Sequence, residues 1–184
     1  MKDIVIVDAV RTPVGRFRGS LAGVRADHLG SLVIGKLLER VDLSPSQVDD
    51  VIFGCVTQIG EQSANIARTA LLGAGWPVTI PGLTLDRKCG SGEAAVHAAA
   101  GAIASGMADV IVAGGAENMS RVPMGSNREI HGEAFGWMAA ERYELTSQGE
   151  ASERMADKWS LSREALDDYA FESHQRAAKA ADAG

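Results

Sequence analysis

Short apolar runs alternate with helical segments along the first 117 residues, and this alternation constrains the fold more than any other feature. Four runs have the length and β-branched content of buried strands: residues 4–7, 51–56, 83–86 and 110–113. Three segments between them carry apolar side chains at helical spacing or end at a helix-terminating glycine: residues 27–41, 63–73 and 92–106. Such alternation predicts βαβ units and an α/β fold with a largely parallel sheet.

The helix expected over residues 92–106 is mostly alanine and is apolar nearly all round. A helix without a polar face is typical of a buried position between two layers. We therefore expect Cys89, which directly precedes it, to lie deep in the molecule. A shorter helix start is expected at Ser44-Pro45-Ser46-Gln47, where serine is the cap and proline the first helical residue.

The composition changes after Glu117. Residues 118–149 contain Met, Gly, Pro and Arg but few apolar runs. A stretch of roughly 30 such residues is too long for an ordinary connection between elements and indicates a functional excursion. Helices are predicted over residues 151–159 and 163–181, the second capped by Ser162. We expect two domains. The first is an α/β core at residues 1–117, and the second is a loop-rich domain of which residues 118–184 form the first part.

Cys89 lies in the turn Asp86-Arg87-Lys88-Cys89-Gly90, between a predicted strand and a predicted helix. Unpaired backbone N–H groups and the positive end of the helix dipole favour a thiolate there, and the thiolate is the nucleophilic form. A lone cysteine is more commonly a buried structural residue, so both interpretations stay open, and the turn favours the nucleophile. Cys55 lies within an apolar run and is expected in the core.

Composition excludes several other classes. The 184 residues carry a net charge of −6, which gives no basic surface for nucleic acid. No apolar run approaches the roughly 20 residues of a membrane span. Two isolated cysteines form neither a disulfide framework nor zinc spacing. The chain starts Met1-Lys2-Asp3 directly before an apolar run, so no signal peptide is visible, and we expect a cytoplasmic protein.

A cysteine that transfers acyl groups needs a base and an oxyanion hole. His97 follows Cys89 by eight residues on one helix, about 12 Å along its axis, which is too far for proton transfer. His28 and His174 are expected on the surface, and His131 lies in the excursion. The Cys89 backbone N–H is a candidate oxyanion donor. Asp86 is interpreted as a turn residue rather than an acid or base.

Four blocks in the chain match one known family. They are Val10 to Phe17, Asn65 to Arg68, Pro81-Gly82 followed by Asp86 to Gly92 with Cys89, and Val112 to Ser120, and a further match covers Trp159 to Glu164 and Ser173 to Gln175. On these residues the chain resembles the thiolases, which comprise acetyl-CoA C-acetyltransferases and 3-ketoacyl-CoA thiolases. The first and fourth blocks favour thiolases over the decarboxylating condensing enzymes, which share the fold and the cysteine.

The resemblance implies a layered thiolase-like fold and thiolysis of a 3-ketoacyl-CoA by CoA, or the reverse Claisen condensation, through a thioester on Cys89. It implies no metal or redox cofactor, with coenzyme A as a substrate. Thiolases are roughly twice as long, and their second half supplies a Gly-His-Pro base and a second catalytic cysteine that this sequence lacks. Three possibilities remain open: an enzyme completed by a separate C-terminal half, a fragment of a longer enzyme, and a non-catalytic pairing subunit.

The resemblance further places residues 118–184 in the thiolase loop domain, which takes part in tetramer assembly and CoA binding. It implies that Ser147, Gln148 and Gly149 lie near the pantetheine channel, and that the chain forms a homo-oligomer. Many acetoacetyl-type thiolases carry His-Met-Gly at this position, so Ser147-Gln148-Gly149 favours a degradative 3-ketoacyl enzyme of β-oxidation type. The stretch around Arg121, together with Arg128, could contact CoA phosphates or another subunit. The alternative is that it forms a solvated loop. Gly114-Gly115 is interpreted as a closely packed strand end, because no dinucleotide-binding motif surrounds it.

Overall fold

A computed structural model of the protein describes residues 3–128 and 130–184, which form two compact units divided between Glu133 and Ala134. Met1 and Lys2, on which the expected absence of a signal peptide rests, lie outside the described residues. The domain boundary expected at residue 117 stays a prediction. Residues just beyond it hydrogen-bond to the first unit, as Asn118 does through its side chain to the Leu21 and Val24 carbonyl oxygens.

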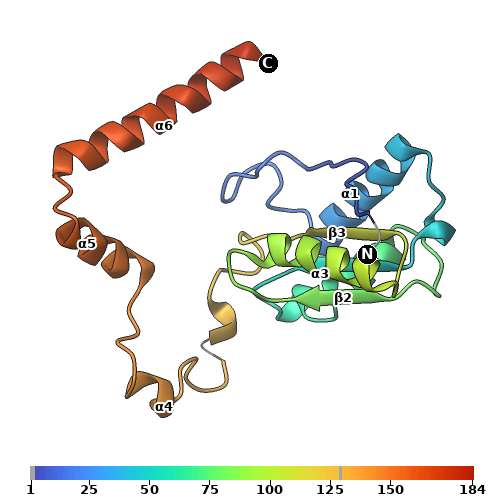
Figure 1. Ribbon diagram of the computed structural model, residues 1–184, viewed down its shortest axis with the longest axis horizontal. Coiled ribbons are helices and arrows are strands. Elements are labelled where there is room, and N and C mark those ends of the chain that lie inside the picture. Colours follow the sequence, from blue (N-terminus) through green and yellow to red (C-terminus); the bar gives the residue numbers. More distant parts are fainter. Residues whose placement is uncertain (1–2, 129) are drawn as a thin grey trace. The chain divides into compact units, whose positions relative to one another are not determined.

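Three parallel strands form the described sheet of the first unit, in the order β2-β1-β3 (Figure 1). They are β1 (Asp50–Gly54), β2 (Gly82–Leu85) and β3 (Ile111–Gly115). The chain passes from β1 to β2 through helix α2 (Ile66–Gly73) and from β2 to β3 through α3 (Ser91–Ser105). The prediction of βαβ units with a parallel sheet is confirmed.

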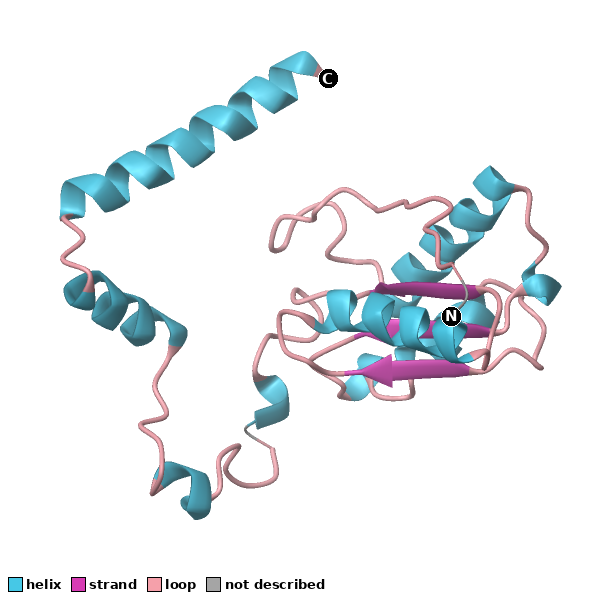
Figure 2. Cartoon of the chain, viewed as in Figure 1, coloured by secondary structure: helices cyan, strands magenta, loops and turns pink. Residues whose placement is uncertain are grey.

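Alternate residues of β1 face two different layers. Val51 and Phe53 point to the side on which α1 (Ala26–Val41) and α2 pack, and this side holds the larger core. Ile52 points to the other side, where it packs against Ala95 and Ala99 of α3. Figure 2 shows α3 running across the front of the sheet. The sheet is thus covered on both faces, as parallel sheets are.

The two layers differ in how they are held. Ile34 of α1 and Leu71 of α2 are almost fully buried, and burying such a side chain stabilises a fold by roughly 1.5–3 kcal/mol. The small side chains of α3 bury much less apolar area each. The position of α3 therefore depends on how closely its backbone can approach the sheet.

Residues 4–7 do not form the predicted buried strand. They have no strand pairing, and Val5, Ile6 and Val7 are 74%, 78% and 77% exposed. A β-branched run becomes a strand only beside another strand that pairs its N–H and C=O groups, and the three described strands pair only with each other. The next residue is fixed, because Asp8 Oδ2 lies 2.6 Å from Arg40 Nε of α1.

The expectation that α3 is buried all round, with Cys89 deep in the molecule, is also wrong. Only Ser91, Ala94, Ala95 and Ala99 of α3 are buried, and Cys89 is exposed. The sheet covers one side of the helix, and no described segment covers the other. The alanine content correctly indicated close packing, but it does not show on how many sides a helix is packed.

The second unit contains α4 (Trp137–Ala140), α5 (Gln148–Lys158) and α6 (Arg163–Ala183). Serine caps both longer helices: Ser147 Oγ accepts the Glu150 N–H at 3.2 Å and Ser162 Oγ accepts the Ala165 N–H at 3.1 Å. The predicted Ser162 cap is confirmed. Short 3₁₀ turns occur in the first unit at Pro45–Gln47, Gly60–Gln62 and Ser126–Arg128, and the first has the predicted capping box.

Candidate active site

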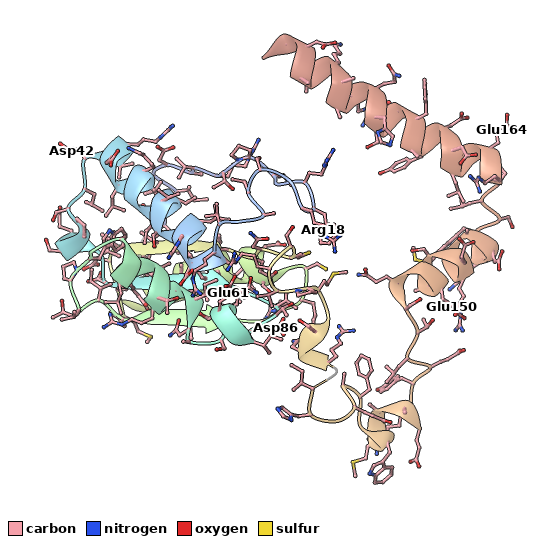
Figure 3. The ribbon with its side chains drawn as sticks, turned by 180° about the vertical axis from the view of Figure 1, so that it is seen from behind. Arg18, Asp42, Glu61, Asp86, Glu150 and Glu164 are labelled. Carbon is pink, nitrogen blue, oxygen red and sulfur yellow. The ribbon has the colours of Figure 1, made fainter. Side chains whose placement is uncertain are left out.

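The three strands end at one edge of the sheet, and the segments that follow them lie together there. β1 leads into residues 55–57, β2 into the turn with Cys89, and β3 into residues 116–121. Sites of parallel α/β sheets form at the carboxyl ends of the strands. Asp86 and Arg18 lie toward this end of the first unit in Figure 3.

Cys89 lies between β2 and α3, as the sequence predicts. The two N–H groups that follow it are used inside the turn, since Gly90 donates to the Arg87 carbonyl oxygen and Ser91 to that of Lys88. Lys88 has φ +51°, a left-handed conformation that costs a non-glycine residue about 1 kcal/mol or more. This strained residue directly precedes Cys89 and fixes the direction in which the chain enters the helix.

Asp86 holds the strained turn. Its Oδ1 accepts the Lys88 backbone N–H at 2.7 Å, and its Oδ2 pairs with Lys88 Nζ. Burial raises the pKa of Asp86, but the hydrogen bonds from Lys88 outweigh this, so the net pKa is below its usual value. The contacts agree with the interpretation of Asp86 as a turn residue rather than a proton donor.

The start of α3 lies directly against the end of β1. A Cβ atom at Gly54 would come within 2.4 Å of the Ser91 carbonyl carbon and 2.6 Å of the Gly92 nitrogen. Ser91 is buried, and its Oγ accepts the Arg87 N–H at 2.8 Å while donating to the Lys88 carbonyl oxygen at 2.6 Å. The backbone after Cys89 therefore rests on β1 without an intervening side chain.

Cys55 has surroundings opposite to those of Cys89. It is 1% exposed, as predicted for a core residue. Burial, the charge and hydrogen bond of Glu117 and a smaller contribution from Asp86 together raise the pKa of the Cys55 thiol to about 12. A neutral, buried thiol is a poor nucleophile, so Cys89 is the better candidate of the two.

A polar network that the sequence did not reveal lies beside the Cys89 turn. Glu117 Oε1 accepts the backbone N–H groups of Val56 and Thr57 at 3.1 and 2.9 Å. Gln62, which is 1% exposed, donates to the Thr57 carbonyl oxygen at 2.8 Å and accepts the Asn118 N–H at 3.0 Å. The only hint in the sequence is that Glu117 and Asn118 follow a strand end.

Ion pairs attach the loop before α1 to the same edge. Arg25 pairs with Asp27 at 2.9 Å and with Glu61 at 3.3 Å. Glu61 also pairs with Arg121, whose guanidinium lowers the pKa of the Glu61 carboxyl. The Arg18 N–H donates to Ser120 Oγ at 2.8 Å. Arg121 is thus a structural contact within the first unit.

The remaining predicted residues lie apart from Cys89 or in the other unit. All four histidines are exposed, and His97 lies 3.7 Å from Glu93 on the outer side of α3. Gly115 is closely packed as expected, because a Cβ there would approach the Gly54 carbonyl oxygen to 2.7 Å. Ser147, Gln148 and Gly149 are exposed at the start of α5 in the second unit, so their role beside the substrate stays a prediction.

Comparison with known proteins decides the family. A sequence profile described as "Thiolase, N-terminal domain" matches residues 4–184. The chain belongs to the thiolase family. It is 46% identical to the steroid 3-ketoacyl-CoA thiolase of Mycobacterium tuberculosis, and the match covers 100% of this chain and 47% of that protein.

Two further relatives agree with this assignment. The chain is 43% identical to the beta-ketoadipyl-CoA thiolase of Pseudomonas putida and 40% identical to the 3-oxoadipyl-CoA/3-oxo-5,6-dehydrosuberyl-CoA thiolase of Escherichia coli. Each match covers 100% of the chain and 50% of the relative. The chain therefore spans about half the length of the curated thiolases that it matches.

Within residues 3–128 and 130–184, no group of three or more His, Cys, Asp or Glu side chains could hold a metal ion. In that same part of the chain, no helix has the length and apolar character needed to cross a membrane.

Proposed function

We propose that this chain carries the nucleophile of a thiolase-type acyltransferase, and that polypeptide outside this chain completes the active site. The observation that carries the proposal is the exposed Cys89 at a strained strand-to-helix turn, within a chain that matches the thiolase N-terminal domain over residues 4–184. A thiolate at such a turn meets the backbone N–H groups and positive dipole of the helix start.

In the proposed reaction the Cys89 thiolate attacks the C3 carbonyl carbon of a 3-ketoacyl-CoA. The C2–C3 bond breaks, the acyl group stays on sulfur as a thioester, and the released enolate takes a proton to become acetyl-CoA. The thiolate of a second CoA then attacks the thioester and leaves with the acyl group. The Cys89 N–H is the candidate oxyanion donor from this chain.

We infer that the base and the proton donor come from polypeptide outside this chain. The four histidines are exposed. The Asp86 carboxylate accepts the Lys88 backbone N–H and pairs with the Lys88 ammonium group. We propose that the missing groups belong to a second half or subunit, and that the whole protein is an oligomer. The relatives are named for 3-ketoacyl-CoA and 3-oxoadipyl-CoA substrates, which supports thiolysis of a 3-ketoacyl-CoA as the reaction. We further propose that the reaction is degradative and takes place in the cytoplasm.

Joining this chain to the second half of the Pseudomonas putida relative tests the proposal. We expect the folded chimera to cleave 3-ketoadipyl-CoA in the presence of CoA, with Cys89→Ala abolishing turnover and Cys55→Ala as the matched control that retains it. A folded chimera that turns over equally well with Cys89→Ala would contradict the proposal. A folded but inactive chimera would favour the alternative of a non-catalytic pairing subunit.

The chain alone is expected to show negligible thiolysis. Each missing acid or base contributes roughly 10²–10⁴-fold. Turnover of the isolated chain near the usual range of about 1–10³ per second would show that it contains its own base.

A further inference from the structure

We propose that Glu117, at the end of β3, is a positioning residue that fixes the Cys89 turn through the segment Gly54–Thr57. The proposal rests on the proposed function only in naming Cys89 as the group to be positioned. Each link is a contact within the first unit, and none depends on the second unit.

The first link joins Glu117 to the segment after β1. One carboxylate oxygen, Oε1, accepts two consecutive backbone N–H groups, those of Val56 and Thr57, and lies 3.8 Å from Cys55 Sγ. Glu117 therefore ties the ends of β1 and β3 together where the strand ladder has stopped.

The second link joins that segment to both ends of the Cys89 turn. On the entry side, the Cys55 N–H donates to the Leu85 carbonyl oxygen at 3.0 Å, directly before Asp86. On the exit side, the Gly54 backbone lies against Ser91 and Gly92. The segment thus contacts the residues immediately before and after the turn, and a shift of the segment moves both.

Gln62 supports the segment from a second side. Its buried amide binds the Thr57 carbonyl oxygen and the Asn118 N–H, and thus bridges the segment to the residue after Glu117. Buried polar networks of this kind hold a structure in one arrangement when every member is satisfied. Among the described residues, no buried side-chain nitrogen or oxygen lacks a partner.

Two conservative variants of the full chain separate position from charge. Glu117→Gln keeps the length and an acceptor oxygen but removes the charge. Glu117→Asp keeps the charge but draws the carboxylate back by one methylene, out of reach of Val56 and Thr57. Glu39→Asp, an exposed carboxylate on α1, is the matched control for the shortening itself.

The measurement is the rate of Cys89 alkylation by iodoacetamide across a pH series, followed by peptide mass spectrometry. Positioning predicts a profile for Glu117→Gln and Glu39→Asp close to that of the unchanged chain. For Glu117→Asp it predicts alkylation at neutral pH slower by about threefold, because a displaced Cys89 no longer meets the positive end of the helix dipole in the same geometry. Hydrogen exchange at Val56 and Thr57 should be faster in Glu117→Asp alone.

Two results would overturn the inference. An altered profile in Glu117→Gln with an unchanged one in Glu117→Asp would mean that charge, not position, matters. Unchanged profiles in both folded variants would mean that Glu117 does not position Cys89 at all. Because alkylation needs no acyl transfer, these outcomes are separate from a failure of the proposed reaction, which the chimera detects.

Discussion

At the scale of single residues, the two cysteines show how surroundings decide reactivity. Cys55 and Cys89 belong to segments that contact each other, yet one is 1% exposed and the other lies open at a helix start. Sequence context correctly placed Cys55 in the core, because an apolar run predicts burial, but it wrongly placed Cys89 deep in the molecule, because an apolar helix predicts a second covering layer. It could not reveal Glu117, whose contacts with Val56 and Thr57 span about 60 residues of sequence.

The raised pKa of Cys55 has a consequence for stability at high pH. An unfolded cysteine loses its proton near pH 8.5, whereas the buried thiol keeps it up to a pKa of about 12. Between these values the folded state binds more protons than the unfolded state, so stability falls as the pH rises, by up to about 1.4 kcal/mol per pH unit.

Urea unfolding at about pH 8 and about pH 10, on the unchanged chain and Cys55→Ala, measures this effect. We expect the unchanged chain to lose more stability than the variant over that interval. Equal losses in the two proteins would show that Cys55 does not titrate abnormally.

At the scale of elements, local patterns predicted the elements whose partners lie within this chain. The three strands of the sheet, helices α1 to α3 and the caps at Ser44 and Ser162 form where spacing and capping residues indicate. The strand at residues 4–7 and the second layer over α3 failed for a common reason. Both depend on a neighbouring surface, and a sequence pattern shows what a segment can pack against but not whether that surface is present.

The contact between β1 and α3 can be tested at Gly54. Gly54→Ala places a methyl group 2.4 Å from the Ser91 carbonyl carbon, and such overpacking costs about 1–3 kcal/mol. Gly101→Ala in α3 is the matched control, because a Cβ there meets nothing within 4 Å and gains about 0.5–1 kcal/mol of helix stability. Chemical denaturation should shift in opposite directions for the two variants. A neutral Gly54→Ala would show that α3 is not held by close backbone contact.

At the scale of the whole molecule, much apolar surface is uncovered. Val5, Ile6 and Val7 are exposed near the start of the first unit, Val96 and Met107 are exposed on or just after α3, and Trp137, Met155, Trp159, Tyr169 and Phe171 are exposed in the second unit. Large apolar side chains in contact with water favour burial against another surface. Together with a length about half that of the relatives, they lead us to expect association with a second polypeptide or another copy of the chain.

Light scattering of the purified chain at tens of micromolar measures this directly. We expect a mass above that of the 19.3 kDa monomer, because water-exposed apolar area favours association. A stable monomer across that concentration range would contradict the expectation.

Trapping of the acyl-enzyme intermediate shows which residue carries the acyl group, which we propose is Cys89. The active chimera is mixed with acetyl-CoA, quenched in acid, which preserves thioesters, and digested for peptide mass spectrometry. The account predicts an acetyl group on the peptide that contains Cys89, absent from Cys89→Ala and unaffected by Cys55→Ala. An acetyl group on Cys55 or on any other residue, with none on Cys89, would contradict it.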